Sequence, residues 1–289
     1  MVGIILAGGS GTRLWPLTKH TSKQLLPVYD KPMIYYPLGT LMLAGIREIV
    51  IISTPRDIDS FKLLLGDGSA YGIQLHYVVQ EKPLGLVQAF PLSEKYIQGK
   101  KVCLILGDNI FYGPQLGGSL TRFTELIGGQ IFGYKVRNPE DYGVVVLDAD
   151  GEILRIEEKP ENSLSNIAIP GLYFYDEKIL DIASKVKPSP RGELEISTLN
   201  NLYLEQNNLK IEILPRGTAW FDTGDINNLL EASLFVKTIE TRQGTKICCP
   251  EEIALAKSWI TKGDLRINIS KQAKNDYRDY LELLLLEHD

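Results

Sequence analysis

An apolar run that leads into a glycine-rich turn opens the chain and constrains its fold most. Val2–Leu6 is a short apolar segment, which indicates a buried first strand. The turn Gly8-Gly-Ser-Gly11 follows, and its small residues let backbone N–H groups approach an anion closely. Arg13 and Lys23 then place two cations near that turn. A strand, a loop of bare amides and fixed positive charge together predict a phosphate-binding site.

Two well-known phosphate-binding motifs do not fit this turn. A P-loop needs Lys and then Ser or Thr after its last glycine, whereas Thr12 and Arg13 follow Gly11. The dinucleotide-binding fingerprint needs a third glycine or alanine, and Leu14 occupies that position. An ordinary glycine turn between a strand and a helix would explain the glycines but not the nearby cations. The motif therefore argues against a nicotinamide dehydrogenase.

Apolar runs alternate with helical patterns over the first two-thirds of the chain. This alternation predicts an α/β fold with a Rossmann-like, mixed and mostly parallel sheet that is wound with helices on both faces. Pro91 lies inside the third helix and is expected to disturb it. The candidate strands are Val2–Leu6, Glu48–Ser53, Gln74–Val79, Val102–Leu106 and Gln130–Val136, and the candidate helices are Met33–Gly45, Asp57–Leu65, Gly85–Tyr96 and Gln115–Ile127.

A β-hairpin and a helical end complete the predicted architecture. Val144–Leu147 and Ile153–Glu157 flank a turn at Asp148-Ala-Asp-Gly151 and are typical of a hairpin. After Asp225 the chain becomes mainly helical and ends with Tyr277–Glu287. The leucines of that last helix are expected to pack on the body or on a neighbouring subunit rather than on lipid.

Charge and cysteine usage narrow the class of partner. The net charge of −5 argues against nucleic acid or a membrane surface as the main partner. The three cysteines form no Cys-x-x-Cys motif, so structural zinc is not expected and a reducing cytosol fits. The apolar start is too short for a signal peptide, and no stretch approaches a membrane span. We therefore expect a cytoplasmic protein that acts on small molecules.

Two aspartates are candidates for a metal site. Asp108 follows the apolar run Val102–Leu106, and ligands of open parallel sheets collect at the carboxyl ends of strands. A triphosphate needs a hard cation, and Mg²⁺ takes a few carboxylate oxygens while keeping waters. Asp222 offers a second carboxylate on a short strand, although nothing in the sequence places it beside Asp108. A solvated turn residue is the alternative interpretation of Asp108.

With Arg13 and Lys23 included, the N-terminal string resembles the signature of the sugar-nucleotide pyrophosphorylases. These nucleotidyltransferases join a nucleoside triphosphate to a sugar 1-phosphate. The segment Ser22-Lys-Gln-Leu-Leu-Pro27 is most similar to that of the thymidylyltransferase members, since uridylyl-, guanylyl- and adenylyltransferase relatives carry different residues there. The resemblance continues to about Ile260. It implies a nucleotidyltransferase core at 1–241 with nucleotide and sugar-phosphate halves, and a helical oligomerisation or regulatory segment at 242–289.

The resemblance also implies residue roles at the nucleotide end. The matching nucleotide-binding positions are Leu6, Gly8, Gly9, Gly11, Thr12, Arg13, Lys23, Gln80, Gly85, Leu86 and Asp108. Arg13, Lys23 and Asp108 are the expected catalytic residues, and Asp108 and Asp222 would share Mg²⁺. The amide of Gln80 can both donate and accept, as pairing with a pyrimidine base requires. Leu84 stands where relatives usually carry a charged residue, so the shape of that loop is left open.

At the sugar end, the resemblance implies a second set of residues. The matching positions are Asn109, Gly143, Glu158, Lys159, Ile169, Gly171, Tyr173, Arg191 and Trp220. Glu158 is expected to hold sugar hydroxyls, while Lys159 and Arg191 are expected to bind the phosphate. Charged residues at a strand end are usually only solvated, and that interpretation of Glu158 and Lys159 would be favoured if the resemblance were absent.

The implied reaction needs little acid–base chemistry. A sugar phosphate is largely a dianion at neutral pH and can attack the α-phosphorus in line, which expels pyrophosphate. The protein must position two polyanions and neutralise charge, with Arg13 the expected partner of the departing phosphates. Only His20, His76 and His288 are present, so a histidine-based mechanism finds little support.

The resemblance thus implies dTTP and glucose 1-phosphate as substrates and dTDP-glucose as product, in a homotetramer built as a dimer of dimers. The product would supply deoxysugars such as dTDP-rhamnose for surface polysaccharides. Two alternatives stay open: a uridylyltransferase that uses UTP, and a non-catalytic sensor of sugar nucleotides on the same fold. A sensor need not keep Arg13, Lys23, Asp108, Lys159 and Asp222, which argues against it.

Two positions differ from a regulatory site that many relatives share. Those relatives are inhibited by dTDP-rhamnose at a second site, which usually includes a histidine after Phe-Tyr-Gly and an arginine after Glu-Glu-Ile-Ala-x. This chain has Pro114 at the first position and Ala256, followed by Lys257 and Ser258, at the second. We expect feedback inhibition that is weakened or altered, or a different dTDP-sugar as the end product.

Overall fold

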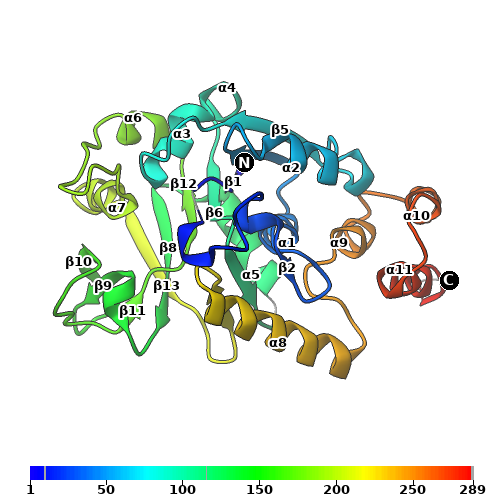
Figure 1. The fold of residues 1–289 in the computed structure, drawn as a ribbon. Coiled ribbons are helices and arrows are strands. Elements are labelled where there is room, and N and C mark those ends of the chain that lie inside the picture. The colour runs from blue at the N-terminus through cyan, green and yellow to red at the C-terminus, as the bar shows by residue number, and fades with distance from the viewer. Residues whose placement is uncertain (10, 115, 288–289) are drawn as a thin grey trace.

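The computed structural model describes residues 1–9, 11–114 and 116–287. Ser10 of the predicted glycine-rich turn, Gln115 at the start of a predicted helix, and His288 lie outside the described residues. One large mixed sheet runs through the molecule and helices cover its two faces, so the predicted α/β class is confirmed (Figure 1). Its strands are β1 (Val2–Leu6), β4 (Glu48–Ser53), β5 (Gln74–Val79), β6 (Val102–Leu106), β8 (Gly129–Lys135), β9 (Gly143–Leu147), β10 (Ile153–Glu158), β11 (Ile167–Ala168), β12 (Leu172–Tyr175) and β13 (Leu209–Ile213).

The parallel half of the sheet consists of β6, β1, β4 and β5 in that order. Every residue of β1 is buried, and β1 pairs in parallel with β4 on one side and with β6 on the other. Helices on both faces of a parallel sheet require strands that are apolar on both faces, which explains the continuous apolar runs of the sequence. These four strands have the bounds that the sequence predicts.

Beyond β6 the sheet becomes largely antiparallel. β12 lies between β6 and β8 and runs antiparallel to both. On the far side of β8, the strands β9, β10 and β11 form a lobe at the opposite side of the molecule from α10 and α11 (Figure 1). Two short two-stranded sheets stand apart: β7 (Asn109–Tyr112) pairs with β14 (Ala219–Asp222), and β2 (Pro27–Val28) pairs with β3 (Lys31–Pro32).

The helices agree with the predicted positions except at residues 85–96 and in the second half of the predicted helix Gln115–Ile127, where a 3₁₀ turn at Arg122–Glu125 follows α5. At residues 85–96 the difference is larger. There the chain forms a 3₁₀ turn at Leu86–Gln88 and two short helices, α3 and α4, because Pro91 has no N–H to continue an α-helical ladder. The helices are α1 (Tyr35–Leu43), α2 (Ile58–Leu65), α3 (Ala89–Leu92), α4 (Glu94–Ile97), α5 (Leu116–Thr121), α6 (Ile179–Ala183), α7 (Ile196–Leu204), α8 (Ile226–Gln243), α9 (Pro250–Ala256), α10 (Lys262–Ser270) and α11 (Asp276–Glu287).

The last three helices share the main hydrophobic core. Buried side chains of α9, α10 and α11 belong to the same cluster as those of α1 and β4. In α11, Leu281 and Leu284 are buried against this core, whereas Leu283 and Leu286 are exposed. The apolar face of the helix is thus packed on the body of the molecule. Among the described residues, no helix has both the length and the apolar character needed to cross a membrane.

A buried network of four charges fixes the β2–β3 hairpin to the end of α8. Lys31 Nζ lies 2.8 Å from Asp30 Oδ1 and 3.0 Å from Glu240 Oε1, and Lys246 Nζ lies 2.6 Å from Asp30 Oδ2. The two positive and two negative charges balance, so neither sign is left buried without a partner. This network ties the segment that follows Lys23 to the helix that follows Asp222.

Candidate active site

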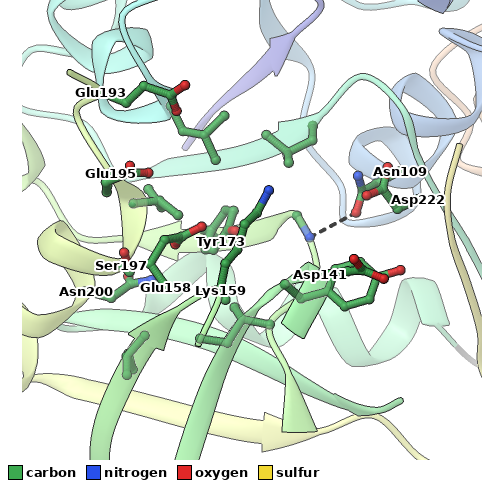
Figure 2. Close-up of a pocket in the computed structure, with 18 of the residues that line it drawn as sticks. Asn109, Asp141, Glu158, Lys159, Tyr173, Glu193, Glu195, Ser197, Asn200 and Asp222 are labelled. Carbon is green, nitrogen blue, oxygen red and sulfur yellow. Dashed lines mark hydrogen bonds between the residues drawn. The ribbon is translucent and has the colours of Figure 1, made fainter. Parts of the chain in front are cut away.

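A cavity of about 260 Å³ opens where the parallel and antiparallel halves of the sheet meet (Figure 2). Its walls come from the ends of β6, β7, β10 and β14, from the loop before β12, and from the start of α7. The structure brings most of the predicted residues together here. Those that line the cavity are Arg13, Leu86, Asp108, Asn109, Gly143, Glu158, Lys159, Ile169, Gly171, Tyr173, Arg191, Trp220 and Asp222.

The pairing of β7 with β14 brings the two candidate metal ligands together. Asn109 pairs with Asp222 in the register of these strands, so Asp108 lies beside the end of β14. Thr223 fixes this end, since its backbone N–H and its hydroxyl both donate to the Asp108 carbonyl, at 3.0 and 2.8 Å. The residue pattern alone did not place the two aspartates together and only the resemblance implied that they meet; the strand pairing supplies the physical reason.

Burial and like charge raise the energy of this aspartate pair. Burial, and after it the negative charge of Asp108, together raise the pKa of Asp222 to about 6, although Lys23 and Arg13 oppose the shift. Burial also acts to raise the pKa of Asp108, but its ion pair with Lys23 and a hydrogen bond from Asn109 hold that pKa below its usual range. Because the like charge of the two buried carboxylates raises the pKa of Asp222 even with Lys23 and Arg13 nearby, the pair is a suitable place for a further positive charge.

The guanidinium of Arg13 lies at the same end of the cavity. A Cβ atom built on Gly224 would lie 3.0 Å from Asp222 Oδ1 and 3.1 Å from Arg13 Nη2. Arg13 and Asp222 therefore both crowd this glycine, and a larger residue would push them away. The short 3₁₀ turn Thr12–Leu14 that carries Arg13 directly follows the glycine-rich segment.

Asn109 organises the middle of the cavity. Its Oδ1 accepts hydrogen bonds from the Gly171 N–H at 3.0 Å, which is drawn in Figure 2, and from Trp220 Nε1 at 2.7 Å. Its Nδ2 donates to Asp108 Oδ1 at 3.1 Å. Gly171 is required because an added Cβ would lie 2.5 Å from Leu106 Cγ. One side chain thus links β7, β12 and β14.

The end of β10 presents Glu158 and Lys159 to the cavity. Lys159 has a left-handed backbone, with φ of 43°, which costs on the order of 1–3 kcal/mol for a residue other than glycine. Its N–H donates to the Tyr142 carbonyl at 3.1 Å, which holds the turn. Figure 2 shows its side chain between the Glu158 end of the cavity and the Asp222 end. Burial raises the pKa of Glu158, and its hydrogen bond with Ser197 opposes this.

Arg191 lies among three carboxylates without a close partner. Its nearest guanidinium nitrogens are 3.9 Å from Glu158 Oε1, 3.8 Å from Glu193 Oε1 and 3.7 Å from Glu195 Oε1. Its side chain is 49% exposed, so each of these contacts contributes little. The guanidinium can therefore exchange these contacts for a bound phosphate at small cost.

The predicted phosphate-binding turn lies at the same edge of the sheet but outside the lining of this cavity. Leu6 ends β1, and its carbonyl accepts from the Gly107 N–H at 2.9 Å. Gly9 and Gly11 have φ of 109° and 60°, a backbone that favours glycine. Thr12 is exposed at the start of its 3₁₀ turn, and Lys23 lies on a second such turn, Lys23–Leu25.

The residues predicted to read the base lie next to that turn. A Cβ on Gly8 would lie 2.2 Å from Gln80 Oε1, so only glycine lets this amide approach. Gln80 is buried, and its Nε2 donates to Gln88 Oε1 at 2.7 Å. Gly85 has φ of 107°, and its Cβ would lie 2.4 Å from the Leu194 nitrogen. The loop that carries Gly85 therefore packs closely against the loop that carries Arg191 and Leu194.

Several residues that line the cavity were not predicted from the sequence. They include Asp141, Tyr142, Glu193, Glu195, Ser197 and Asn200. Glu193 and Glu195 stand in the same string as Arg191, from which only the arginine was selected. Ser197 and Asn200 are three residues apart on α7, a spacing that places two side chains on one face of a helix. That spacing is the only signal that could have identified them.

The donor set fits Mg²⁺. Its usual protein ligands are one or two carboxylates, and waters and substrate phosphates complete the shell. Asp108 and Asp222 supply two adjacent hard oxygen donors, and their like charge raises the pKa of Asp222 although Lys23 and Arg13 lie close by. No group of three His, Cys, Asp or Glu side chains that could hold a metal occurs among the described residues, so a site made wholly of protein ligands is not the pattern here.

Sequence and fold comparisons identify a consistent set of similar proteins. A family model described as Nucleotidyl transferase matches residues 2–239. The chain is 55% identical to a protein of Mycolicibacterium smegmatis named glucose-1-phosphate thymidylyltransferase, over 99% of both chains. It is 54% identical to a protein of the same name from Xanthomonas campestris pv. campestris, over 98% of this chain and 96% of that one. A Bacillus anthracis protein described by the same name and crystallised with sucrose has a TM-score of 0.75 and 36% identity, covering 81% of this chain and 95% of that one.

Proposed function

The chain belongs to the nucleotidyl transferase family, and we propose that it transfers a thymidylyl group from dTTP to α-D-glucose 1-phosphate, giving dTDP-glucose and pyrophosphate. Its full-length identity of 54–55% to proteins named for this activity supports the choice of substrates. One structural observation carries the proposal. The cavity has Asp108, Asp222 and Arg13 at one end, and Glu158 with Lys159 toward the other. A carboxylate pair suited to a metal ion and an arginine suited to nucleotide phosphates thus adjoin groups suited to a sugar phosphate.

The reaction follows from this arrangement of charges. Lys159 and Arg191 hold the phosphate of glucose 1-phosphate, a dianion that is nucleophilic without a general base. One of its oxygens attacks the α-phosphorus of dTTP, and the bond from that phosphorus to the oxygen of the β-phosphate breaks. Arg13 and Lys23 stabilise the charge that develops on the departing pyrophosphate. Positioning two anions in line accounts for most of the acceleration.

Asp108 and Asp222 are the residues that would hold Mg²⁺. When bound, the ion would neutralise triphosphate charge and orient the phosphates. The contribution of the chain is to keep both carboxylates ionised and facing the cavity. The ammonium of Lys23 does this for Asp108, and Arg13 and Lys23 lower the pKa of Asp222 against the effect of burial.

A product screen tests the proposal. Four nucleoside triphosphates are each combined with the 1-phosphates of glucose, galactose and glucosamine, and pyrophosphate and sugar nucleotide are measured. We expect the highest kcat/KM for dTTP with glucose 1-phosphate. UTP lacks only one methyl group, worth about 1–3 kcal/mol in an apolar pocket, so it should react about 10- to 200-fold more slowly.

Reactions without a sugar phosphate serve as the control and should release no pyrophosphate. Turnover that is equal or faster with UTP would identify a uridylyltransferase instead. Binding of sugar nucleotides without pyrophosphate release from any combination would identify a sensor.

We also propose that feedback inhibition is weaker than in relatives that carry the usual regulatory residues. A second cavity of about 490 Å³ lies between β7 and α9, and Tyr112, Gly113, Ala256 and Lys257 are among its lining residues. The short Ala256 side chain offers no charge to a diphosphate, and the exposed Pro114 offers no imidazole. With dTDP-rhamnose as inhibitor, we expect Ala256→Arg to lower the inhibition constant at least 10-fold; tight inhibition of the unaltered chain through this cavity would contradict the proposal.

Assembly and location are further parts of the proposal. We propose a homotetramer in the cytoplasm, with residues 242–289 as an oligomerisation or regulatory segment. Ile226, Leu230 and Leu234 form an exposed apolar row on α8, and exposed apolar surface often marks an interface. All three cysteines are free and buried, which fits a reducing compartment. The second cavity is lined in part by residues 246–257, which supports a regulatory role for that segment.

A further inference from the structure

One buried amide at the sugar end of the cavity lacks a hydrogen-bond partner. Asn200 lies on α7 and is 0% exposed, yet its side chain lines the cavity. Its Oδ1 accepts a hydrogen bond of 2.7 Å from the Tyr175 hydroxyl. Within the described part of the chain, no group accepts from its Nδ2. Figure 2 shows Asn200 beside Ser197 and Glu158, at the opposite end of the cavity from Asp222.

An unsatisfied buried donor needs an explanation, because it costs on the order of 1–3 kcal/mol and native proteins contain few of them. Two other buried side-chain atoms of the described residues, His76 Nε2 and Ser93 Oγ, also lack a hydrogen bond. Neither residue lines this cavity. Of these three groups, only Asn200 has its free donor at a place where a ligand can enter.

The orientation of this amide is fixed in advance. Tyr175 is fully buried, with its ring 5.3 Å from that of Tyr203 and in edge contact with Phe90 at 5.6 Å. Its hydroxyl therefore cannot move far, and it holds the oxygen of the Asn200 amide. The nitrogen of the same amide must then point elsewhere. A donor held in place before the ligand arrives gains affinity, since little freedom is lost on binding.

The groups around Asn200 select the kind of ligand. Glu158 and Glu195 line the same end of the cavity, and both are mostly buried carboxylates. Arg191, 3.9 Å from Glu158 Oε1 and 3.7 Å from Glu195 Oε1, is the group here that suits the phosphate, and the two carboxylates suit hydroxyl groups instead. A hydroxyl group fits, because it can donate to a carboxylate and accept from an amide N–H at the same time. A pyranose ring presents several such hydroxyls.

We propose that Asn200 is a specificity-determining residue of the sugar site, whose Nδ2 donates a hydrogen bond to one ring hydroxyl of the glucose moiety. Tyr175 acts as a positioning residue, because it is not among the residues that line the cavity and its hydroxyl holds the Asn200 amide. This inference rests on the function proposed above and adds a residue to it. A site built to pair with a hydroxyl rejects an analogue that lacks the hydroxyl, because its own polar group is then left unpaired.

The first measurement uses the unaltered chain. The values of kcat/KM with dTTP are determined for glucose 1-phosphate and for its 2-, 3-, 4- and 6-deoxy analogues. We expect at least one analogue to react 10-fold or more slowly than the parent sugar. If no deoxy analogue is disfavoured, no hydroxyl is paired to a buried group and the inference is wrong. This measurement does not depend on the folding of any variant.

The second measurement compares variants on the same five sugars. Asn200→Asp keeps the shape but replaces the donor by an acceptor, and Tyr175→Phe removes only the hydroxyl that orients the amide. We expect Asn200→Asp to lower kcat/KM for glucose 1-phosphate about 10- to 100-fold, mainly through KM for the sugar, with KM for dTTP unchanged. The decrease in kcat/KM caused by Asn200→Asp should shrink or vanish for one deoxy analogue alone, the one that lacks the hydroxyl paired with Asn200. Tyr175→Phe should give the same pattern with a smaller amplitude.

Asn268→Asp is the matched control. Asn268 lies on α10, and its amide also donates a hydrogen bond, in this case to the Ala70 carbonyl. It should leave all five values unchanged. If Asn200→Asp lowers kcat/KM by the same factor on every sugar, the role of Asn200 is structural and the inference is wrong. Full activity of Asn200→Asp on glucose 1-phosphate would also refute the inference. Failure of the unaltered chain to use glucose 1-phosphate at all would instead refute the proposed function, and the inference with it.

Discussion

Replacing Arg13 with alanine is expected to lower turnover about 10³-fold or more. An arginine that stabilises departing phosphates accounts for 10³–10⁵ in related phosphoryl transfers. Arg13 is suited to this role because its guanidinium lies beside Asp222 at Gly224 and lines the cavity. The loss should appear mainly in kcat, since charge on the pyrophosphate develops only as the bond breaks. Steady-state pyrophosphate release measures it.

Arg266→Ala is the matched control, since Arg266 is an exposed arginine on α10 and the change in net charge is the same. Its turnover should equal that of the unaltered chain. Arg13→Lys should recover part of the activity, because a single ammonium restores the charge but not the planar fork of donors. Near-normal turnover of Arg13→Ala would remove this residue from the chemistry.

Replacing Asp108 with asparagine is expected to abolish Mg²⁺-dependent turnover. The substitution keeps the shape of the side chain but removes one of two adjacent negative charges and the partner of Lys23. An amide oxygen is a weaker ligand for a hard cation than a carboxylate. We expect a loss on the order of 10³-fold or more, in line with the loss of transition-state charge stabilisation. Initial rates are measured over a range of Mg²⁺ concentrations.

Asp150→Asn is the control, because Asp150 lies in the exposed turn between β9 and β10. Its Mg²⁺ dependence should match that of the unaltered chain. Asp222→Asn should need more Mg²⁺ for half-maximal activity, since it removes the other carboxylate of the pair. If Asp108→Asn keeps the Mg²⁺ dependence of the parent, the assignment of Asp108 as a metal ligand is wrong.

The parts of the fold that the sequence predicts are those whose signal is local. β1, β4 and β6 are almost wholly buried, so their apolar runs end where the strands end. β12 is equally buried, but no strand was predicted at Leu172–Tyr175, and of that run only Tyr173 was assigned, to the sugar pocket. Its place between β6 and β8 depends on pairing with strands far away in the chain, which no local pattern shows.

The candidate site also has some features that local sequence predicts and others that depend on long-range contacts. The roles of Arg13 and Lys23 were predicted from residue types beside a glycine-rich turn, and the family to which that turn pointed is confirmed. The meeting of Asp108 with Asp222 depends on a long-range strand pair. Asn200 was missed for another reason: a buried asparagine is ordinary until the structure shows that its nitrogen has no partner.

The contact between Thr223 and Asp108 spans 115 positions of the chain. A polypeptide is synthesised from its N-terminus. A nascent chain therefore contains the residues of β1, β4, β5 and β6 before the second aspartate has been synthesised. Until then the growing polypeptide holds one carboxylate and its lysine, without the partner strand that sets them in place. With the metal ligands assigned as proposed above, a product that ends before Asp222 lacks one of them and is not expected to consume nucleotide.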